Sequence, residues 1–135
     1  MMKPCTKERT RELEKCTVPI SNKCNSLPDG ETRDVLFSSL CQLTSWYYYQ
    51  GFDANEIQKI QNAKIAELLE FKPQYHVCTG SDNYRNAVWG FEYKDKGCVL
   101  YHSKKGLALQ VEKSMNSDTV VALVDLMCKK LCSKS

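Results

Sequence analysis

AVWGFEYKDKGCVLYH, residues 87–102, decides the fold class of this chain. In its first half, Trp89, Phe91 and Tyr93 recur at every second position, as in a strand with one buried face. Residues 94–97 have the composition of a hairpin turn, and the apolar run after them predicts the returning strand. If the hairpin forms, the chain is of the α+β class; without it, an all-α fold is the alternative.

The chain after the hairpin extends the predicted sheet. Lys104, Lys105 and Gly106 indicate a second turn, because they interrupt the apolar pattern and end in a glycine. Residues 107–111 then alternate in part between apolar and polar side chains, which favours a third strand. We therefore expect a small antiparallel sheet at about residues 86–112.

About four helices are expected around this sheet. Three segments have large apolar side chains at intervals of three and four residues, and an N-terminal segment mixes both charge signs at helical spacing around Leu13. Residues 17–30 follow the N-terminal helix and contain Pro19, Pro28 and Gly30, so they indicate a connector to the next helix. The helices span residues 6–16, 31–50 and 53–71, and a final stretch capped by Ser117 or Asp118.

Eight cysteines are the most unusual feature of the composition. Their number is even, and no C-x-x-C pair occurs, so a zinc site built from two tight pairs lacks its usual signature. We therefore expect a disulfide framework that staples the fold, with a metal site and free core thiols as the alternatives. The cysteines expected to pair are Cys5, Cys16, Cys24, Cys41, Cys78, Cys98, Cys128 and Cys132.

Disulfide bonds imply an oxidising compartment, so the expected location is secreted and extracellular. The first five residues contain no apolar run, and the chain is interpreted as a mature form from which a signal peptide was removed. No run of about 18 apolar residues occurs, so no membrane span is expected. A hydrophobic fraction of 42% suits one monomeric globular domain, residues 1–135, and a net charge of +3 is too small for a dedicated nucleic-acid binder.

No motif in the chain specifies a reaction, a metal or a cofactor. The two histidines, His76 and His102, are the residues that acid–base cleavage of RNA would require. No G-x-S-x-G elbow occurs, and the cysteines are assigned to disulfide bonds. We expect a protein that is not an enzyme and needs neither metal nor cofactor; a small ribonuclease or hydrolase using both histidines is an alternative.

The aromatic run at residues 46–49 is the strongest sign of a binding surface. Four consecutive aromatic residues on a helix point in directions about 100° apart, so they cannot all enter one core face. Tryptophan and tyrosine anchor protein interfaces and line apolar pockets, and lysines occupy both predicted turns. The expected function is binding of another protein, as a ligand, toxin, effector or inhibitor, and a carrier of a small hydrophobic ligand is the alternative. The candidate binding residues are Trp46, Tyr48, Tyr49, Lys94, Lys96, Lys104 and Lys105.

Overall fold

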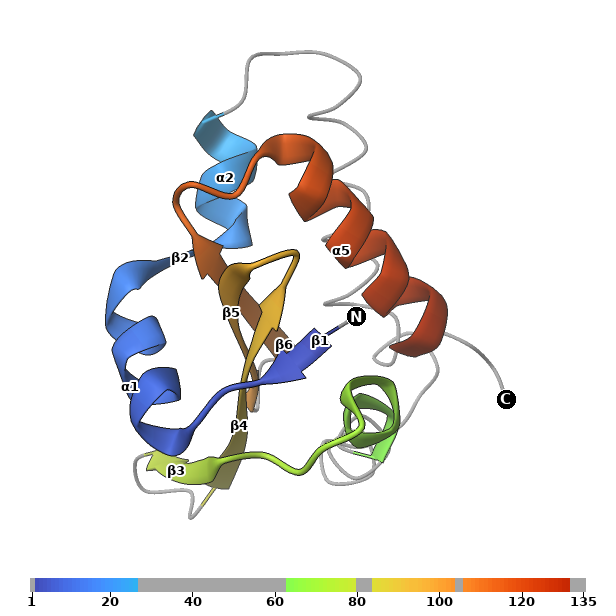
Figure 1. Cartoon of the computed structure of the whole chain (residues 1–135). Coiled ribbons are helices and arrows are strands. Elements are labelled where there is room, and N and C mark those ends of the chain that lie inside the picture. Colours follow the sequence, from blue (N-terminus) through green and yellow to red (C-terminus); the bar gives the residue numbers. More distant parts are fainter. Residues whose placement is uncertain (1, 27–62, 80–83, 104–105, 132–135) are drawn as a thin grey trace.

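An antiparallel sheet of six strands is the centre of the part of the chain that the computed structural model describes, residues 2–26, 63–79, 84–103 and 106–131 (Figure 1). The strand order is β1-β4-β5-β6-β2, and β3 also pairs with β4. All neighbouring strands are antiparallel. The strands are β1 (Met2–Pro4), β2 (Thr17–Pro19), β3 (Tyr75–Thr79), β4 (Tyr84–Tyr93), β5 (Lys96–Ser103) and β6 (Gly106–Glu112).

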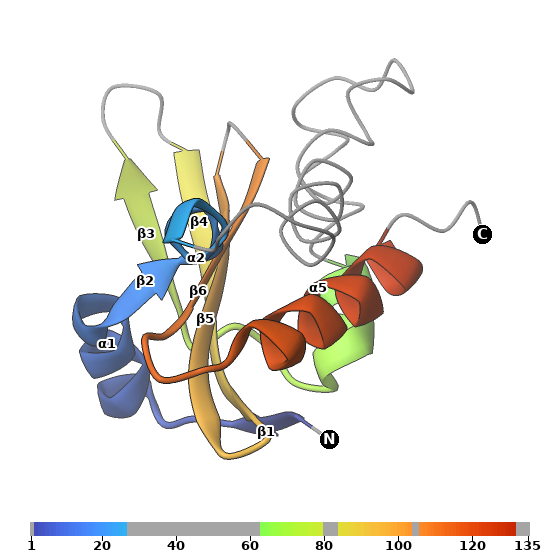
Figure 2. The ribbon, with the colours of Figure 1, turned by 90° about the horizontal axis from the view of Figure 1, so that it is seen from above.

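Helices cover both faces of this sheet. Figure 2 shows α1 on one side of the sheet, and α5 together with the helical residues 63–69 on the other side. The helices with described bounds are α1 (Lys7–Cys16), α2 (Ile20–Ser26) and α5 (Ser117–Leu131). The result is a three-layer arrangement in which the two long strands of the hairpin are buried from both sides.

The predicted hairpin is confirmed, but the expectation of about four helices with a small sheet at residues 86–112 is wrong. The sheet also recruits β1, β2 and β3, all from outside that range, and dominates the described residues. The presence of the sheet equally removes the all-α alternative. Residues 17–26 of the predicted connector form β2 and α2. The predicted helix at 31–50 lies outside the described residues, and of the one at 53–71 the described part is helical from 63 to 69.

The hairpin turn is built by two residues, Lys94 and Asp95. Both have positive φ angles, 49° and 65°, and they join the paired residues Tyr93 and Lys96. A two-residue turn with two left-handed positions matches the twist of the strands it joins. Gly97 therefore belongs to β5 and is free to serve packing rather than the turn.

The main core lies between the sheet and α5. The alternating residues of β4 that predicted the strand enter it, as do apolar residues of β5, β6 and the helical residues 63–69. Trp89 and Phe91 are almost completely buried, and Trp89 Nε1 donates a hydrogen bond to the Phe71 carbonyl at 3.1 Å. Each large apolar side chain buried in this way stabilises the fold by about 1.5–3 kcal/mol. On α5 the contributing residues are Val120, Leu123, Val124, Met127 and Cys128.

A smaller core on the opposite face holds α1. Leu13 is fully buried there against Val88 and Val99. The helix approaches closely because glycines lie beneath it: a Cβ at Gly90 would be 2.0 Å from Thr10 Oγ1, and one at Gly97 would be 2.4 Å from Leu13 Cδ2. The absence of these two side chains sets the distance between α1 and the sheet.

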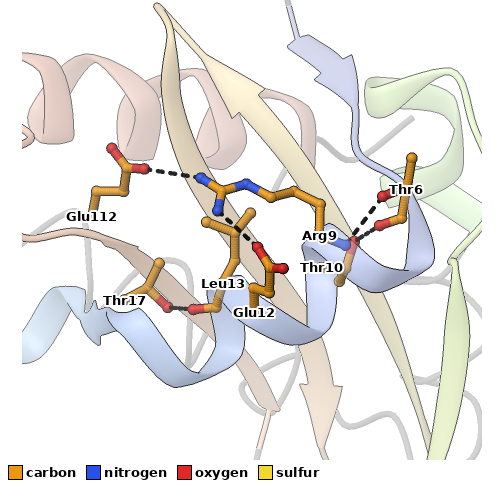
Figure 3. Close-up of polar contacts among 7 residues, drawn as sticks. All are labelled: Thr6, Arg9, Thr10, Glu12, Leu13, Thr17 and Glu112. Carbon is orange, nitrogen blue, oxygen red and sulfur yellow. Dashed lines mark hydrogen bonds and ion pairs between the residues drawn. The ribbon is translucent and has the colours of Figure 1, made fainter.

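Polar contacts fix both ends of α1 (Figure 3). Thr6 caps the helix, since its Oγ1 accepts a hydrogen bond from the Arg9 backbone N–H at 3.1 Å. At the other end, the Thr17 hydroxyl donates to the Leu13 carbonyl. Arg9 then links the helix to β6 through Glu112, 3.6 Å away. The helix was predicted over residues 6–16 and is found at Lys7–Cys16, with Thr6 as its N-cap.

The C-terminal helix is confirmed, but its cap is Asn116, so both the cap and the first helical residue lie earlier than predicted. The side chain of Asn116 accepts a hydrogen bond from the Thr119 backbone N–H at 2.8 Å, which is the contact of an N-cap. Ser117 and Asp118, the predicted caps, are instead the first two residues of α5.

Candidate functional site

The described cysteines do not form the predicted disulfide framework. Cys5, Cys16 and Cys98 carry free thiols. Cys98 points into the main core, where burial, and to a smaller degree Glu112, raise the pKa of its thiol to about 12. A cysteine in this setting acts as a small apolar core residue. Cys128 is also buried in that core, and the side chains of Cys24, Cys41, Cys78 and Cys132 lie outside the described residues. The extracellular location, which was inferred from disulfides, stays a prediction.

The predicted binding residues are only partly within the described chain. Trp46, Tyr48, Tyr49, Lys104 and Lys105 lie outside it. Of the two remaining lysines, Lys94 is in the hairpin turn and Lys96 begins β5, and both already have partners: the Lys94 ammonium lies 5.5 Å from the centre of the Tyr93 ring, and Lys96 Nζ is 3.1 Å from Ser114 Oγ. The turn therefore offers less free charge than its sequence indicates.

The two histidines belong to different strands. His76 is exposed on β3 and pairs with Ala87 of β4. His102 is on β5, one residue after Tyr101, and its side chain is outside the described set. The order β3-β4-β5 places two strand spacings, about 10 Å, between their backbones. The ribonuclease alternative stays a prediction.

A groove of about 580 Å³ lies between α1 and β3. Its helical wall is mostly cationic, and its other wall comes from a strand at the edge of the sheet. Val77, on that strand, is 39% exposed, which is unusual for a large apolar side chain in the described part of this molecule. The lining residues are Lys7, Arg11, Glu14 and Lys15 of α1 and Tyr75, His76 and Val77 of β3.

The cationic wall is a row of like charges on α1. Lys7, Arg11 and Lys15 are exposed and follow one another at intervals of four residues, so they share one face of the helix. Within the described residues none of the three forms an ion pair. Like charges at this spacing destabilise a helix by about 0.2–0.5 kcal/mol per pair. The row therefore carries a cost that an anionic partner would remove.

Tyr75 forms the floor of the groove. The Arg11 guanidinium lies over its ring, 5.4 Å from the ring centre. The Tyr75 hydroxyl oxygen is buried and forms no hydrogen bond of ordinary geometry among the described residues, although the Glu14 carboxylate lies near enough to interact with it. Burial raises the pKa of this phenol, and the nearby Glu14 carboxylate raises it further, so the hydroxyl keeps its proton at neutral pH. A buried donor without an acceptor costs about 1–3 kcal/mol.

The outer edge of β3 pairs with no other strand of the described chain. The Val88 carbonyl accepts a hydrogen bond from the Gln74 backbone N–H at 3.0 Å, so the backbone groups of Val88 point toward β3. Tyr75 lies opposite Val88, and backbone groups alternate in direction along an antiparallel strand. Those of His76 and Cys78 therefore point away from β4.

A second hollow, of about 350 Å³, lies beside β2 and is lined by Val18, Asn22, Lys23 and Lys113. The Lys23 ammonium donates hydrogen bonds to the carbonyls of Lys113 and Met115, the latter at 2.7 Å. This cation holds the loop between β6 and α5 in place. The groove on β3 is the better candidate because Lys7, Arg11 and Lys15 have no such partners among the residues that the structure describes.

Within the described ranges, no three histidine, cysteine or acidic side chains are grouped closely enough to bind a metal ion. The same residues include no helix with the length and apolar character that a membrane crossing needs. No family model, curated protein or solved structure matches the chain. The function is therefore argued from the groove itself.

Proposed function

We propose that this chain is a non-enzymatic protein-binding domain that takes up an extended segment of another protein as an added strand along β3. The single observation that carries this proposal is the open edge of β3 beside the groove. An extended peptide gains main-chain hydrogen bonds from such an edge, while neighbouring pockets select its alternate side chains.

The contrast with the other edge strands supports this role. β1 and β2 each have three residues and each end in a proline, Pro4 and Pro19. Short length and proline are two devices by which proteins prevent an edge from pairing with another chain. β3 has five residues, no proline and an exposed Val77. An edge left without these protections is an expected feature of a strand that pairs with a partner.

The proposal keeps the predicted function, protein binding, but moves the contact surface. The predicted surface was the aromatic run at 46–49 and the lysines of the two turns, and the groove is formed by α1 and β3 instead. Two signals in the sequence point to it: the cationic row at intervals of four, and the short run YHVCT after Pro73. The cationic row is hard to recognise because acidic residues lie between the cations. The run YHVCT is too short to show a clear alternation of apolar and polar side chains.

The test removes the backbone N–H of His76 and leaves the hydrogen bonds between β3 and β4 in place. The probe is a short fluorescent peptide of alternating valine and glutamate, titrated by anisotropy. His76→Pro removes the outward N–H and should abolish binding, whereas His76→Ala loses the same groove-lining side chain but keeps the N–H and should still bind. Circular dichroism melting confirms that both variants fold. Equal binding by the two variants would rule out strand addition at this edge.

A further inference from the structure

Tyr75 at the floor of the groove and Arg11 on its wall would both bind the same kind of ligand group. The Tyr75 hydroxyl is a buried donor that forms no hydrogen bond of ordinary geometry within the described residues, and Arg11 lies over the same ring. A carboxylate is an acceptor of hydrogen bonds from both a hydroxyl and a guanidinium, and such charge-assisted bonds are stronger than neutral ones. One anionic group at this point would pair with Arg11, which forms no ion pair in the described chain, and would offer the Tyr75 hydroxyl a better-placed acceptor than Glu14.

Charge along the groove points the same way. Three cations, Lys7, Arg11 and Lys15, face the groove against one acid, Glu14. The acidic residues that do pair with basic ones in α1 lie elsewhere: Arg9 contacts Glu12 at 3.2 Å. The excess of positive charge is therefore local to the groove wall.

We infer that the segment bound along β3 is acidic, and that one of its carboxylates is anchored by the Tyr75 hydroxyl and the Arg11 guanidinium while Lys7 and Lys15 hold the flanking acidic side chains. This inference rests on the proposed function, because strand addition is what brings an extended segment across the groove. Alternate side chains of the added strand project to one face, so acidic residues at every second position reach the cationic wall together.

A peptide fits these features better than a nucleic acid does. The cationic row alone would also attract phosphates. The open edge of β3, however, presents backbone N–H and C=O groups that pair with another peptide backbone. Glu14 in the lining adds repulsion toward a densely charged phosphate chain.

The experiment compares two probe peptides on one protein: alternating valine and glutamate, and alternating valine and glutamine. The acidic peptide should bind at least tenfold more tightly, and its advantage should shrink as NaCl rises from about 50 mM to about 500 mM. Arg11→Glu should remove the advantage. Lys129→Glu, which makes the same charge change at an exposed position on α5, should leave it intact.

Tyr75→Phe tests the anchor. The variant loses a buried unpaired hydroxyl, so it should fold with unchanged or higher melting temperature. Its affinity for the acidic peptide should fall about tenfold, as expected for one hydrogen bond to a charged group, and its affinity for the glutamine peptide should not change.

The outcomes separate the two proposals. Equal affinity for both peptides, with binding still lost in His76→Pro, overturns the acidic specificity and leaves strand addition standing. Preference for the acidic peptide that persists in His76→Pro overturns strand addition, and the acidic strand with it. Tighter binding of a single-stranded oligouridine than of the acidic peptide overturns both, because the groove would then be a phosphate site.

Discussion

The side-chain amide of Gln74 takes the place of a strand residue opposite Gly90. Its Oε1 accepts a hydrogen bond from the Gly90 backbone N–H at 2.8 Å, and its Nε2 donates to the carbonyls of Gly90 and Cys5, each at 2.8 Å. β1 and β3 pair with opposite ends of β4 on the same edge, and Gly90 lies in the gap between them. One side chain, directly before β3, therefore links β4 to the residue that follows β1.

The first prediction concerns this amide. Gln74→Ala removes three hydrogen bonds and leaves partly buried backbone groups unpaired, so the free energy of unfolding should fall by about 1–3 kcal/mol. Gln74→Glu should also destabilise at neutral pH, because a carboxylate would face two carbonyl oxygens.

The stabilities of these two variants should depend differently on pH. Protonation of the introduced glutamate below about pH 4 restores a hydrogen-bond donor. The loss in free energy of unfolding of Gln74→Glu, relative to the unchanged protein, should therefore become smaller at that pH. The deficit of Gln74→Ala should stay constant. Urea unfolding at several pH values measures both. Parallel pH curves for the two variants would show that the amide is not the bridging group.

The second prediction concerns the packing of α1. Gly90→Ala would place a Cβ within 2.7 Å of three atoms of Thr10, of which the Cβ is held by the helix backbone. Overpacking of this kind destabilises by about 1–3 kcal/mol. Gly97→Ala should cost less, because its nearest contact is the end of the flexible Leu13 side chain.

A double-mutant cycle tests the cause. Thr10→Gly removes all three contacting atoms, and its cost in helix propensity is only about 0.3 kcal/mol because threonine is itself a weak helix former. The combined variant should be more stable than the sum of the two single changes predicts. Additive effects would show that Gly90 is needed for a reason other than the approach of Thr10.

The sequence predicts the long elements of this fold and misses the short ones, for a physical reason. The hairpin has enough residues to show a period of two, and its turn and both core-forming strands follow from it. β1 and β2 have three residues each, which is too few to show an alternation of apolar and polar side chains. They become strands because an already formed neighbour offers them backbone partners, which is a tertiary effect.

The groove was missed for a related reason. Its two walls are separated by about 60 residues in sequence, and the registry that brings Tyr75 beneath Arg11 depends on the pairing of β3 with β4. Charge patterning on α1 alone reads as an ordinary solvated face. Disulfide bonds were predicted from cysteine number, but number does not reveal that Cys98 is directed into an apolar core.

The third prediction compares two thiols. Cys16 is exposed and should react with a thiol reagent such as Ellman's reagent within the native protein. Cys98 is buried, so its labelling must wait for an opening of the fold and should be at least about a hundredfold slower. Peptide mapping after timed alkylation assigns each site. Comparable rates would mean that the sheet face under α5 is open to solvent.

The last prediction follows from the raised pKa of Cys98. An unfolded thiol ionises near its ordinary pKa of 9.0, whereas burial raises the pKa of the folded Cys98 thiol to about 12. Between these values the unfolded chain releases a proton that the folded chain keeps, so ionisation favours unfolding. The contribution of Cys98 to stability is therefore complete below about pH 9 and is lost as the pH rises toward 12.

The contribution of Cys98 is measured as the difference in the free energy of unfolding between a variant and the unchanged protein at each pH. A difference is needed because other side chains also ionise at alkaline pH. Cys98→Ala should be less stable than the unchanged protein at neutral pH, since it leaves a small cavity, and the gap should close as the pH rises above 9. Val99→Ala truncates a buried neighbour without a thiol, so its gap should stay constant over the same range. If both gaps change together, the alkaline loss of stability arises from other groups, and Cys98 ionises no less readily in the folded protein than in the unfolded chain.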